Sequence, residues 1–165
     1  MHLDQFNAAS RTKAGDFLRP CLDIQRLIDE LADARPYPSL EALLAAGRAA
    51  ASPFAPAEID AALAHHPRIG ERAQGDSTEA RMSQAEQAGL GAADAAVAQA
   101  LAAGNRAYEE KFGQVFLIRA AGRSRREILA ALNTRLTHTP EQEQLIIGQQ
   151  LREIAVLRLE GLISK

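Results

Sequence analysis

The apolar residues of this chain recur mainly at helical intervals, and helix breakers separate the apolar runs at a few places. Alanine and leucine dominate while β-branched residues are sparse, which favours α-helices throughout. Asp23 is placed to cap a helix whose apolar face covers residues 24–31, and Arg35-Pro36-Tyr37-Pro38 ends it. Ser39 opens the next predicted helix, which runs through Ala50.

The middle of the chain combines short and long predicted helices with one loop. After a proline-rich break, a short helix ends near His65. The stretch 70–78 lacks apolar periodicity, which is typical of an exposed loop. Residues 92–111 form a long alanine-rich helix that tolerates Gly104, and Gly113 is placed to end it.

Two later helices are marked by capping boxes, in which a serine or threonine and a glutamate or glutamine satisfy exposed backbone donors. These are Ser124-Arg125-Arg126-Glu127 and Thr139-Pro140-Glu141-Gln142, and the second helix is expected to reach about Leu162. Val115-Phe116-Leu117-Ile118 is too short to assign by periodicity, so we expect an extended segment that threads the core. The elements predict an all-α fold, a single-domain bundle of about seven to nine helices over residues 1–165.

Charge and composition exclude several classes of protein. The chain has 165 residues, a formal net charge of -2 and a pI of about 6.1, which argues against nucleic-acid binding. We interpret the small basic group within residues 119–126 as a solvated surface, with contact to an anionic ligand as the alternative. The single Cys21 excludes an internal disulfide and favours a reducing, cytoplasmic location. Neither a targeting segment nor a membrane span is expected.

His66 is the first candidate for chemistry, because it stands directly before Pro67 in a loop-like segment. Proline pushes the preceding residue into an extended conformation, so His66 is expected to lie outside any helix arriving from its N-terminal side. An imidazole titrates at about pH 6.5, which suits proton transfer at physiological pH. The alternative is a loop histidine that caps a helix end or faces solvent.

Arg158 is the second candidate, because it falls on the apolar stripe of the last helix, between Ile154 and Leu162. A guanidinium stays charged in a protein, so burial requires an anionic partner. That partner is either a substrate or an internal carboxylate, and a snorkelling side chain near a bundle end is a further possibility.

Ser83-Gln84-Ala85-Glu86-Gln87 is the third feature, since Ser83 and Glu86 have the spacing of another capping box. The predicted helix start explains the pattern on its own. A helix N-terminus also offers free amide donors to an anionic or carbonyl-rich ligand, and both interpretations are compatible.

Five motifs together occur in the order and approximate spacing of one family. They are His66-Pro67-Arg68-Ile69-Gly70, Ser83-Gln84-Ala85-Glu86-Gln87, Asn105-Arg106-Ala107-Tyr108-Glu109-Glu110-Lys111-Phe112-Gly113, Phe116-Leu117-Ile118 and Ile154-Ala155-Val156-Leu157-Arg158-Leu159. In these motifs the chain resembles the 2-oxo-4-hydroxy-4-carboxy-5-ureidoimidazoline (OHCU) decarboxylases, ureide-pathway enzymes that make (S)-allantoin after urate oxidation. The N-terminal third matches least, because the chain lacks the tryptophan that family members often carry near residues 22–34.

The resemblance implies an all-helical homodimer that decarboxylates a small ureidoimidazoline carboxylate without a metal or an organic cofactor. It places the acid/base histidine on His66, the motif glutamate on Glu86 and the arginine of the last helix on Arg158. The substrate-contacting positions that it implies are Pro67, Ser83, Gln84, Ala85, Glu86, Gln87, Phe116, Leu117, Ile118, Arg119 and Ala120.

The chemistry of such a reaction defines the expected roles. The ring imine accepts the electron pair left by carbon dioxide, so an electron-sink cofactor is not required. We expect His66 to take or hydrogen-bond the ring hydroxyl proton and then to supply a proton to one face, with Glu86 orienting the imidazole or the substrate. Arg158 is expected to align the carboxylate with the ring π system or to hold a carbonyl oxygen that gains charge.

Two other classes of protein compete with this interpretation. A non-enzymatic helical module would explain the helices and capping boxes equally well, but it gives no reason for Arg158 on an apolar stripe together with His66 before a proline. Stabilisation of the fold by allantoin separates that module from an enzyme. A metal hydrolase built on His65 and His66 is disfavoured, because adjacent histidines seldom share one metal.

Overall fold

The computed structural model describes residues 1–71, 73–91 and 94–163, and in that part of the chain all regular elements are helices. The helices are α1 (Leu3–Ala8), α2 (Arg11–Leu18), α3 (Gln25–Asp33), α4 (Leu40–Ala49), α5 (Pro56–Leu63), α6 (Thr78–Ala88), α7 (Ala95–Phe112), α8 (Arg125–Arg135) and α9 (Pro140–Leu162). The all-α prediction is confirmed, and the number of helices described lies at the upper end of the predicted range.

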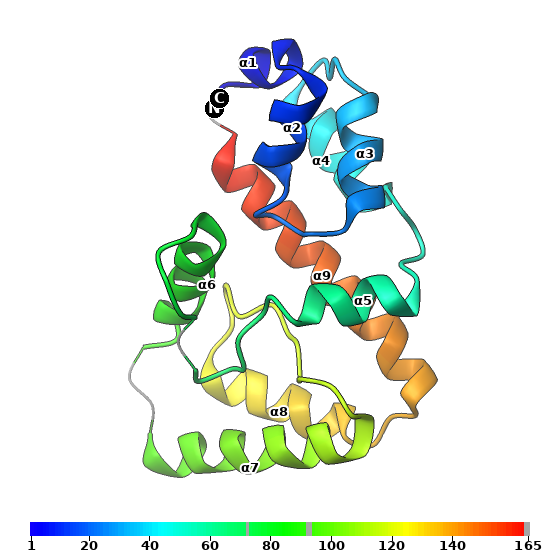
Figure 1. The fold of residues 1–165 in the computed structure, drawn as a ribbon. Helices are drawn as coiled ribbons and strands as arrows, with labels where there is room; N and C mark the ends of the chain where they lie inside the picture. Colours follow the sequence, from blue (N-terminus) through cyan, green and yellow to red (C-terminus); the bar gives the residue numbers. More distant parts are fainter. Residues whose placement is uncertain (72, 92–93, 164–165) are drawn as a thin grey trace.

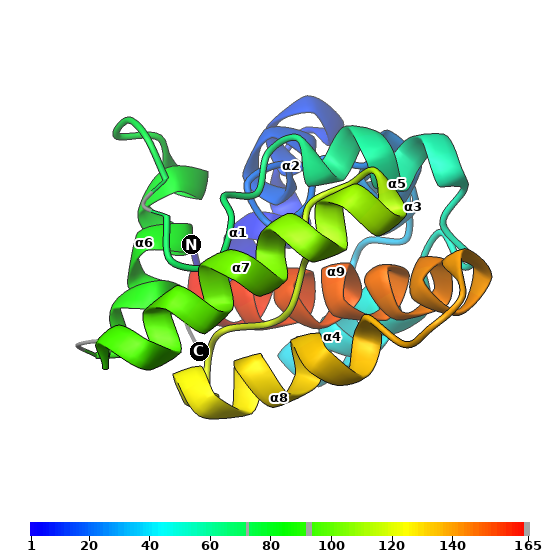
Figure 2. The same cartoon turned by 90° about the horizontal axis from the view of Figure 1, so that it is seen from below.

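The long helix α9 joins the two ends of the molecule (Figure 1). At one end α1–α4 surround it, with α4 packed along α9 and α2 along α3. At the other end α7 and α8 lie side by side, as the view from below also shows (Figure 2). The N-terminus lies beside the end of α9, where the Met1 amino group donates to the Leu162 carbonyl at 3.2 Å.

Side-chain caps fix most helix starts where the sequence predicts them. Ser39, Ser124 and Thr139 each accept a hydrogen bond from a first-turn amide, and α9 ends at Leu162 as expected. The prediction for Asp23 is wrong, because the N-cap of α3 is Ile24 and the Asp23 carboxylate instead accepts from Arg19 at 2.6 Å. An arginine four residues earlier supplies a charged donor, which removes Asp23 from the helix amides.

Helix α7 follows the prediction within the described residues. Asp94 caps it and Gly113 ends it with a left-handed φ of 70°, whereas the predicted start at Ala92 lies outside the described residues. A Cβ on Gly104 would collide with the buried Leu132 side chain of α8. The glycine therefore allows the close approach of α7 and α8.

The segment 114–121 crosses the core without regular structure, as predicted for the run Val115–Ile118. Phe116, Leu117 and Ile118 are 1%, 4% and 5% exposed. Leu117 packs into the cluster formed with α1–α5 and α9, whereas Phe116 and Ile118 pack into the cluster formed with α7 and α8. Alternate side chains facing opposite sides are typical of extended backbone, and here they join the two clusters.

Helix α6 stands to one side of this arrangement (Figure 1). Of the described residues, none from α6 belongs to either apolar cluster, and within the helix only Ala80 and Ser83 are buried. Polar side chains connect α6 to its surroundings, among them Gln87, which bonds to Gly70, Arg68 and Glu71. The helix is thus attached by hydrogen bonds and ion pairs rather than by apolar packing.

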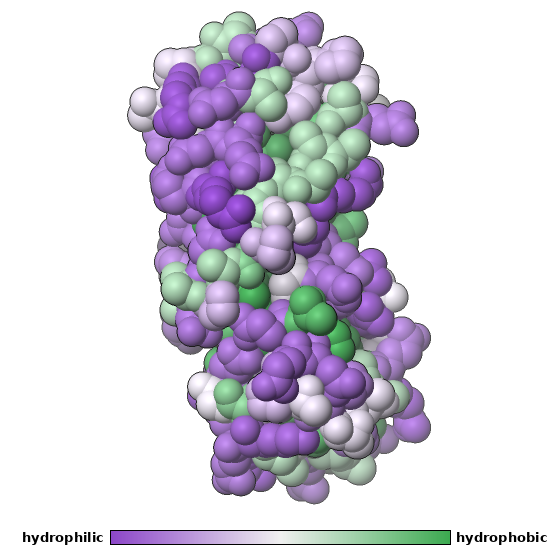
Figure 3. All heavy atoms as spheres, turned by 90° about the vertical axis from the view of Figure 1, so that its right-hand side faces the viewer, coloured by the Kyte–Doolittle hydropathy of each residue, from purple (hydrophilic) through white to green (hydrophobic). Residues whose placement is uncertain are grey.

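On the face drawn in Figure 3, hydrophilic side chains cover most of the area, and apolar side chains form groups among them. Among the described residues, the exposed large apolar side chains are Leu145 and Leu157. No helix in that part of the chain combines the length and the apolar character needed to cross a membrane.

Candidate active site

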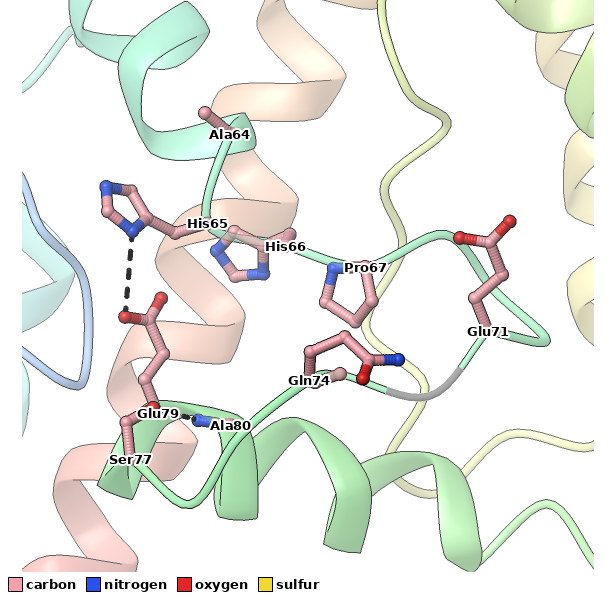
Figure 4. A pocket seen from close by; sticks show the side chains of 10 residues that line it. Ala64, His65, His66, Pro67, Glu71, Gln74, Ser77, Glu79 and Ala80 are labelled. Carbon is pink, nitrogen blue, oxygen red and sulfur yellow. Dashed lines mark hydrogen bonds and ion pairs between the residues drawn. The ribbon is translucent and has the colours of Figure 1, made fainter.

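His66 lies just after α5, where the chain leaves the helix. Its amide still donates to the Leu63 carbonyl at 3.1 Å, and Pro67 then directs the chain away from the helix. The side chain is half-buried. One side borders an outer cleft of about 620 Å³, shown in Figure 4, which His65, Glu71 and Glu79 also line. His66 therefore lies outside the helix, as the sequence predicts, and its imidazole lines an open cleft.

The surroundings of His66 favour its neutral form. Burial is the main cause that lowers its pKa from 6.5 to about 3, and the charges of Arg158 and His65 lower it further. Burial disfavours the imidazolium because the protein solvates a cation less well than water does. At physiological pH His66 is therefore an imidazole with a free nitrogen lone pair.

His65 has a different environment from His66. In Figure 4 its ring is turned toward Glu79, and Nδ1 lies 3.9 Å from the Glu79 carboxylate. Among the residues that the structure describes, no group of three or more histidine, cysteine, aspartate and glutamate side chains is arranged to hold a metal ion. His65 Nε2 also lies 3.6 Å from the Asp23 carboxylate, so His65 lies between two carboxylates whereas His66 lines the inner side of the cleft.

Arg158 is buried and paired with Glu86. Arg158 Nε donates to one Glu86 oxygen at 2.7 Å, and Nη2 donates to the other at 3.1 Å. The guanidinium also donates to Ser83 Oγ at 3.0 Å and to the Pro20 carbonyl at 3.2 Å. Arg158 is 4% exposed, so α6 supplies the anionic partner that its position on the apolar stripe requires.

An inner hollow brings most of the predicted site residues together. It is lined by His66, Pro67, Ile69, Ser83, Glu86, Gln87, Phe116, Leu117, Ile118, Ala120 and Ile154. The α5–α6 loop, α6, the segment 114–121 and α9 thus meet at one place. The volume of the hollow is about 20 Å³, which is room for about one water molecule.

Four of the predicted residues lie outside the lining of the inner hollow. Arg158 and Ala85 line a second cleft of about 410 Å³, which also borders Glu86. The Gln84 amide donates to the Ala73 carbonyl at 3.0 Å, and the Arg119 side chain forms an ion pair with Glu153 at 3.3 Å. Arg158 therefore reaches the hollow through Glu86 and Ser83, which it binds and which line it.

The expected helix start at Ser83 is wrong. Helix α6 begins at Thr78, and its N-cap is Ser77, whose hydroxyl accepts from the Ala80 amide at 3.1 Å. Ser83 lies in the middle of the helix, where its amide is no longer free, and its hydroxyl binds Arg158 instead. The Ser83–Glu86 spacing therefore places two side chains on one helix face toward the same guanidinium.

Sequence reasoning missed two kinds of residue near the hollow. Ile69 and Ile154 line it, and only the apolar stripe of the last helix gave a signal for Ile154. The second kind is a pair of buried charged residues, Arg135 and Glu143. Arg135 Nε lies 2.8 Å from Glu143 Oε1. Glu143 lies in the first turn of α9, where an acidic residue usually faces solvent, so its burial has no signature in the sequence.

A comparison with models of known protein families identifies the family of this chain. The OHCU decarboxylase family model matches residues 7–160. The chain belongs to the OHCU decarboxylase family. The match includes all the motifs that meet at the hollow as well as the N-terminal helices α2–α4.

Two curated proteins are similar to this OHCU decarboxylase family member over part of their length. It is 38% identical over 106 residues to the uric acid degradation bifunctional protein TTL of Arabidopsis thaliana, covering 62% of this chain and 33% of that protein. It is 34% identical over 101 residues to the 2-oxo-4-hydroxy-4-carboxy-5-ureidoimidazoline decarboxylase of Amia calva, covering 60% and 58%. The alignments thus span less than two thirds of either relative.

Solved structures share the fold of this family member. One, described as OHCU decarboxylase in the presence of (S)-allantoin, matches 91% of this chain and 99% of its own with a TM-score of 0.73 and 27% identity. Another, described as (S)-allantoin synthase, matches 99% of this chain and 54% of its own with a TM-score of 0.72. The second is 19% identical, which establishes likeness of fold alone.

Proposed function

We propose that this protein is a carboxy-lyase that converts OHCU to (S)-allantoin in urate degradation. The observation that carries the proposal is the meeting of His66, Glu86 and the segment 114–121 at one hollow. Membership of the OHCU decarboxylase family supports the choice of substrate. So does the similarity to a decarboxylase solved in the presence of (S)-allantoin.

The reaction defines what the site must do. The bond between the ring carbon and the carboxylate breaks, and its electron pair moves into the adjacent ring C=N bond, whose nitrogen takes a proton from solvent. The hydroxyl-bearing carbon becomes a carbonyl as it loses its hydroxyl proton, and the neighbouring carbon gains a proton. That last proton creates the stereocentre, so the protein must deliver it to one face.

His66 is suited to move both protons. As a neutral imidazole it accepts the proton of the ring hydroxyl while carbon dioxide leaves. The lowered pKa weakens His66 as a base, so it takes the hydroxyl proton only as carbon dioxide leaves, and the imidazolium then gives up a proton to the carbon that carries the ureido group. Because His66 is fixed on one side of the hollow, it delivers the proton to a single face of the ring.

Glu86 and Arg158 have separate tasks in this proposal. The donors of Arg158 already bind Glu86, Ser83 and the Pro20 carbonyl, so we assign Arg158 to positioning Glu86 rather than to a direct clamp on the carboxylate. Glu86 lines the hollow and accepts hydrogen bonds from the N–H groups of the substrate ring and its ureido arm. This orients the ring relative to His66.

The segment 114–121 and α6 form the two walls between which the substrate lies. Phe116 and Ile118 exclude water from the developing negative charge. The hollow is too small for the substrate, so α6 moves outward on binding while the apolar clusters stay intact. The substrate enters through the outer cleft, which opens onto the same imidazole.

The direct test of the proposed function follows the handedness of the product. OHCU is generated freshly by hydrolysis of hydroxyisourate, and circular dichroism is recorded with and without the protein. We expect a rapid signal of (S)-allantoin only with the protein. A signal no faster and no more one-handed than in the protein-free sample would contradict the proposed function.

The family resemblance also implies a homodimer, which we retain as a prediction. Sedimentation equilibrium of the purified chain, whose mass is 17.8 kDa, measures the mass of the assembly directly. A dimer is expected, and a species of monomer mass across the accessible concentrations would contradict it.

A further inference from the structure

The segment 114–121 forms one wall of the hollow but has few backbone partners of its own. Within the described residues, the backbone of residues 115–119 forms its hydrogen bonds with two side chains. Gln150 of α9 accepts from the Arg119 amide at 2.9 Å, and Arg135 Nη1 of α8 donates to the Leu117 carbonyl at 2.6 Å. The position of the wall therefore depends on these side chains.

Arg135 holds this wall by more than one contact. Its guanidinium carbon lies 4.5 Å from the centre of the Phe116 ring and 5.8 Å from that of Tyr108. These distances are those of cation–π contacts. The two rings meet edge to face with their centres 5.3 Å apart. Arg135 thus contacts both the carbonyl of Leu117 and the ring of the residue before it.

Glu143 fixes Arg135 in turn. Both residues are buried, at 5% and 0% exposure, and their Nε and Oε1 atoms are 2.8 Å apart. The Tyr108 hydroxyl donates to the same Oε1 at 2.6 Å, and His138 Nδ1 lies 2.9 Å from Oε2. Burial and the bond to Glu143 raise the pKa of Tyr108, so its hydroxyl remains a donor. Side chains of α7 and α9 therefore set the place of an α8 arginine.

A buried ion pair of this kind is a weak source of stability, because the desolvation of both ions offsets their attraction. Its effect here is on geometry, since Arg135 connects the α7–α9 frame to an otherwise sparsely bonded wall. We propose that Arg135, held by Glu143, is a positioning residue of the active site, which sets where the substrate ring lies relative to His66. This inference rests on the proposed function.

The test compares Arg135→Lys with Arg126→Lys, a matched substitution on the exposed face of the same helix. Lysine keeps the charge beside Glu143 but lacks the planar fork that reaches the Leu117 carbonyl as well. We expect amide exchange in peptides covering 114–121 to quicken about tenfold and KM to rise about tenfold, the size expected for one lost charge-assisted hydrogen bond. The enantiomeric excess of the allantoin should also fall, whereas Arg126→Lys should match wild type.

Enantiomeric excess is compared at equal rates of catalysed turnover, so that the spontaneous, racemic reaction contributes equally and a smaller amount of active protein does not by itself change the value. Wild-type exchange, KM and enantiomeric excess in folded Arg135→Lys would overturn the proposal. So would exchange that quickens equally throughout α7–α9, since that would mark a general stability role.

If Arg135→Lys does not fold, Tyr108→Phe removes one donor to Glu143 while keeping the ring, and it should change the same quantities by about threefold. No change in Tyr108→Phe would then overturn the proposal.

The exchange measurement needs no substrate, so it tests the role of Arg135 independently of the proposed decarboxylase function. A wild-type protein that makes no (S)-allantoin contradicts the proposed function, while exchange in 114–121 still decides whether Arg135 holds that segment. An active wild type with unchanged exchange and kinetics in Arg135→Lys contradicts the positioning role alone.

Discussion

Arg158 meets Glu86 in a two-pronged ion pair, with Nε and Nη2 at 2.7 and 3.1 Å from the two carboxylate oxygens. The pair joins the last helix to α6, which has no place in either apolar cluster. Arg158 thus satisfies its own buried charge and fixes the carboxylate that lines the hollow. This one contact therefore couples the attachment of α6 to the position of the carboxylate that the proposed reaction uses.

Arg158→Lys tests this coupling. Lysine keeps the charge but lacks the planar fork that binds both Glu86 oxygens and Ser83 at once. We expect kcat/KM to fall about 100-fold, as is typical when a group near the reacting atoms is displaced by about 1 Å. Steady-state formation of (S)-allantoin measures the change.

The matched control is Arg11→Lys, which alters an exposed arginine paired with Asp33. Exposed pairs contribute little to stability and lie apart from the hollow, so activity should remain within twofold of wild type. An Arg158→Lys protein that is folded and as active as Arg11→Lys would contradict the assigned role.

The pKa of His66 predicts a pH dependence of stability. The folded-state pKa is about 3, below the ordinary 6.5, so between these values the unfolded chain binds a proton that the folded protein excludes. The stabilisation is fully present above pH 6.5 and is lost as the pH falls toward 3. When the pH falls from 6.5 to 4.5, the unfolding free energy of wild type should decrease by about 1–2 kcal/mol more than that of His66→Asn. Equal losses in urea titrations of both proteins would contradict the lowered pKa.

Outward movement of α6 predicts a change in hydrogen exchange when a ligand binds. Saturating (S)-allantoin should add contacts to Glu86 and Gln87, and so slow the amides of α6 several-fold. The amides of α2–α3, remote from the hollow, serve as the internal reference. Slowing shared equally by α2, α3 and α6 would indicate global stabilisation and contradict a local movement of α6.

Alanine substitutions at two helical glycines, one packed against a neighbouring helix and one with open space beside it, test how closely α7 and α8 pack. A Cβ on Gly104 would collide with Leu132, whose side chain is fully buried, whereas a Cβ on Gly161 would meet nothing within 4 Å. We expect Gly104→Ala to cost about 1–2 kcal/mol of unfolding free energy after the gain in helix propensity of about 1 kcal/mol. Gly161→Ala should stabilise by up to about 1 kcal/mol. A stabilised Gly104→Ala protein would show that α7 and α8 separate easily.

The fold was predictable wherever a local signal decides the structure. The caps Ser39, Ser124 and Thr139 act on amides within three residues, so the sequence alone identifies them. The same reasoning failed at Ser83, because a distant guanidinium rather than a local amide uses its hydroxyl. Helices α1 and α2 were not predicted, although Ser10 caps α2 in the same manner.

The candidate site was predictable in composition but not in its internal contacts. The family resemblance named His66, Glu86 and Arg158, because its motifs include these three positions. Arg158 and Glu86 are 72 residues apart in the sequence, so their pairing depends on how α6 and α9 are placed, which no local pattern encodes. Burial of Glu143 is equally a tertiary property, since the first turn of a helix normally exposes its acids.

In the proposed reaction, His66 moves the protons that make the product one-handed. The most direct test is circular dichroism of freshly generated OHCU with wild type, His66→Ala and the control His2→Ala, which alters an exposed histidine at the start of α1. We expect (S)-allantoin from wild type and His2→Ala, and only the spontaneous, racemic reaction with folded His66→Ala. Wild-type turnover and enantiomeric excess in His66→Ala would contradict the account.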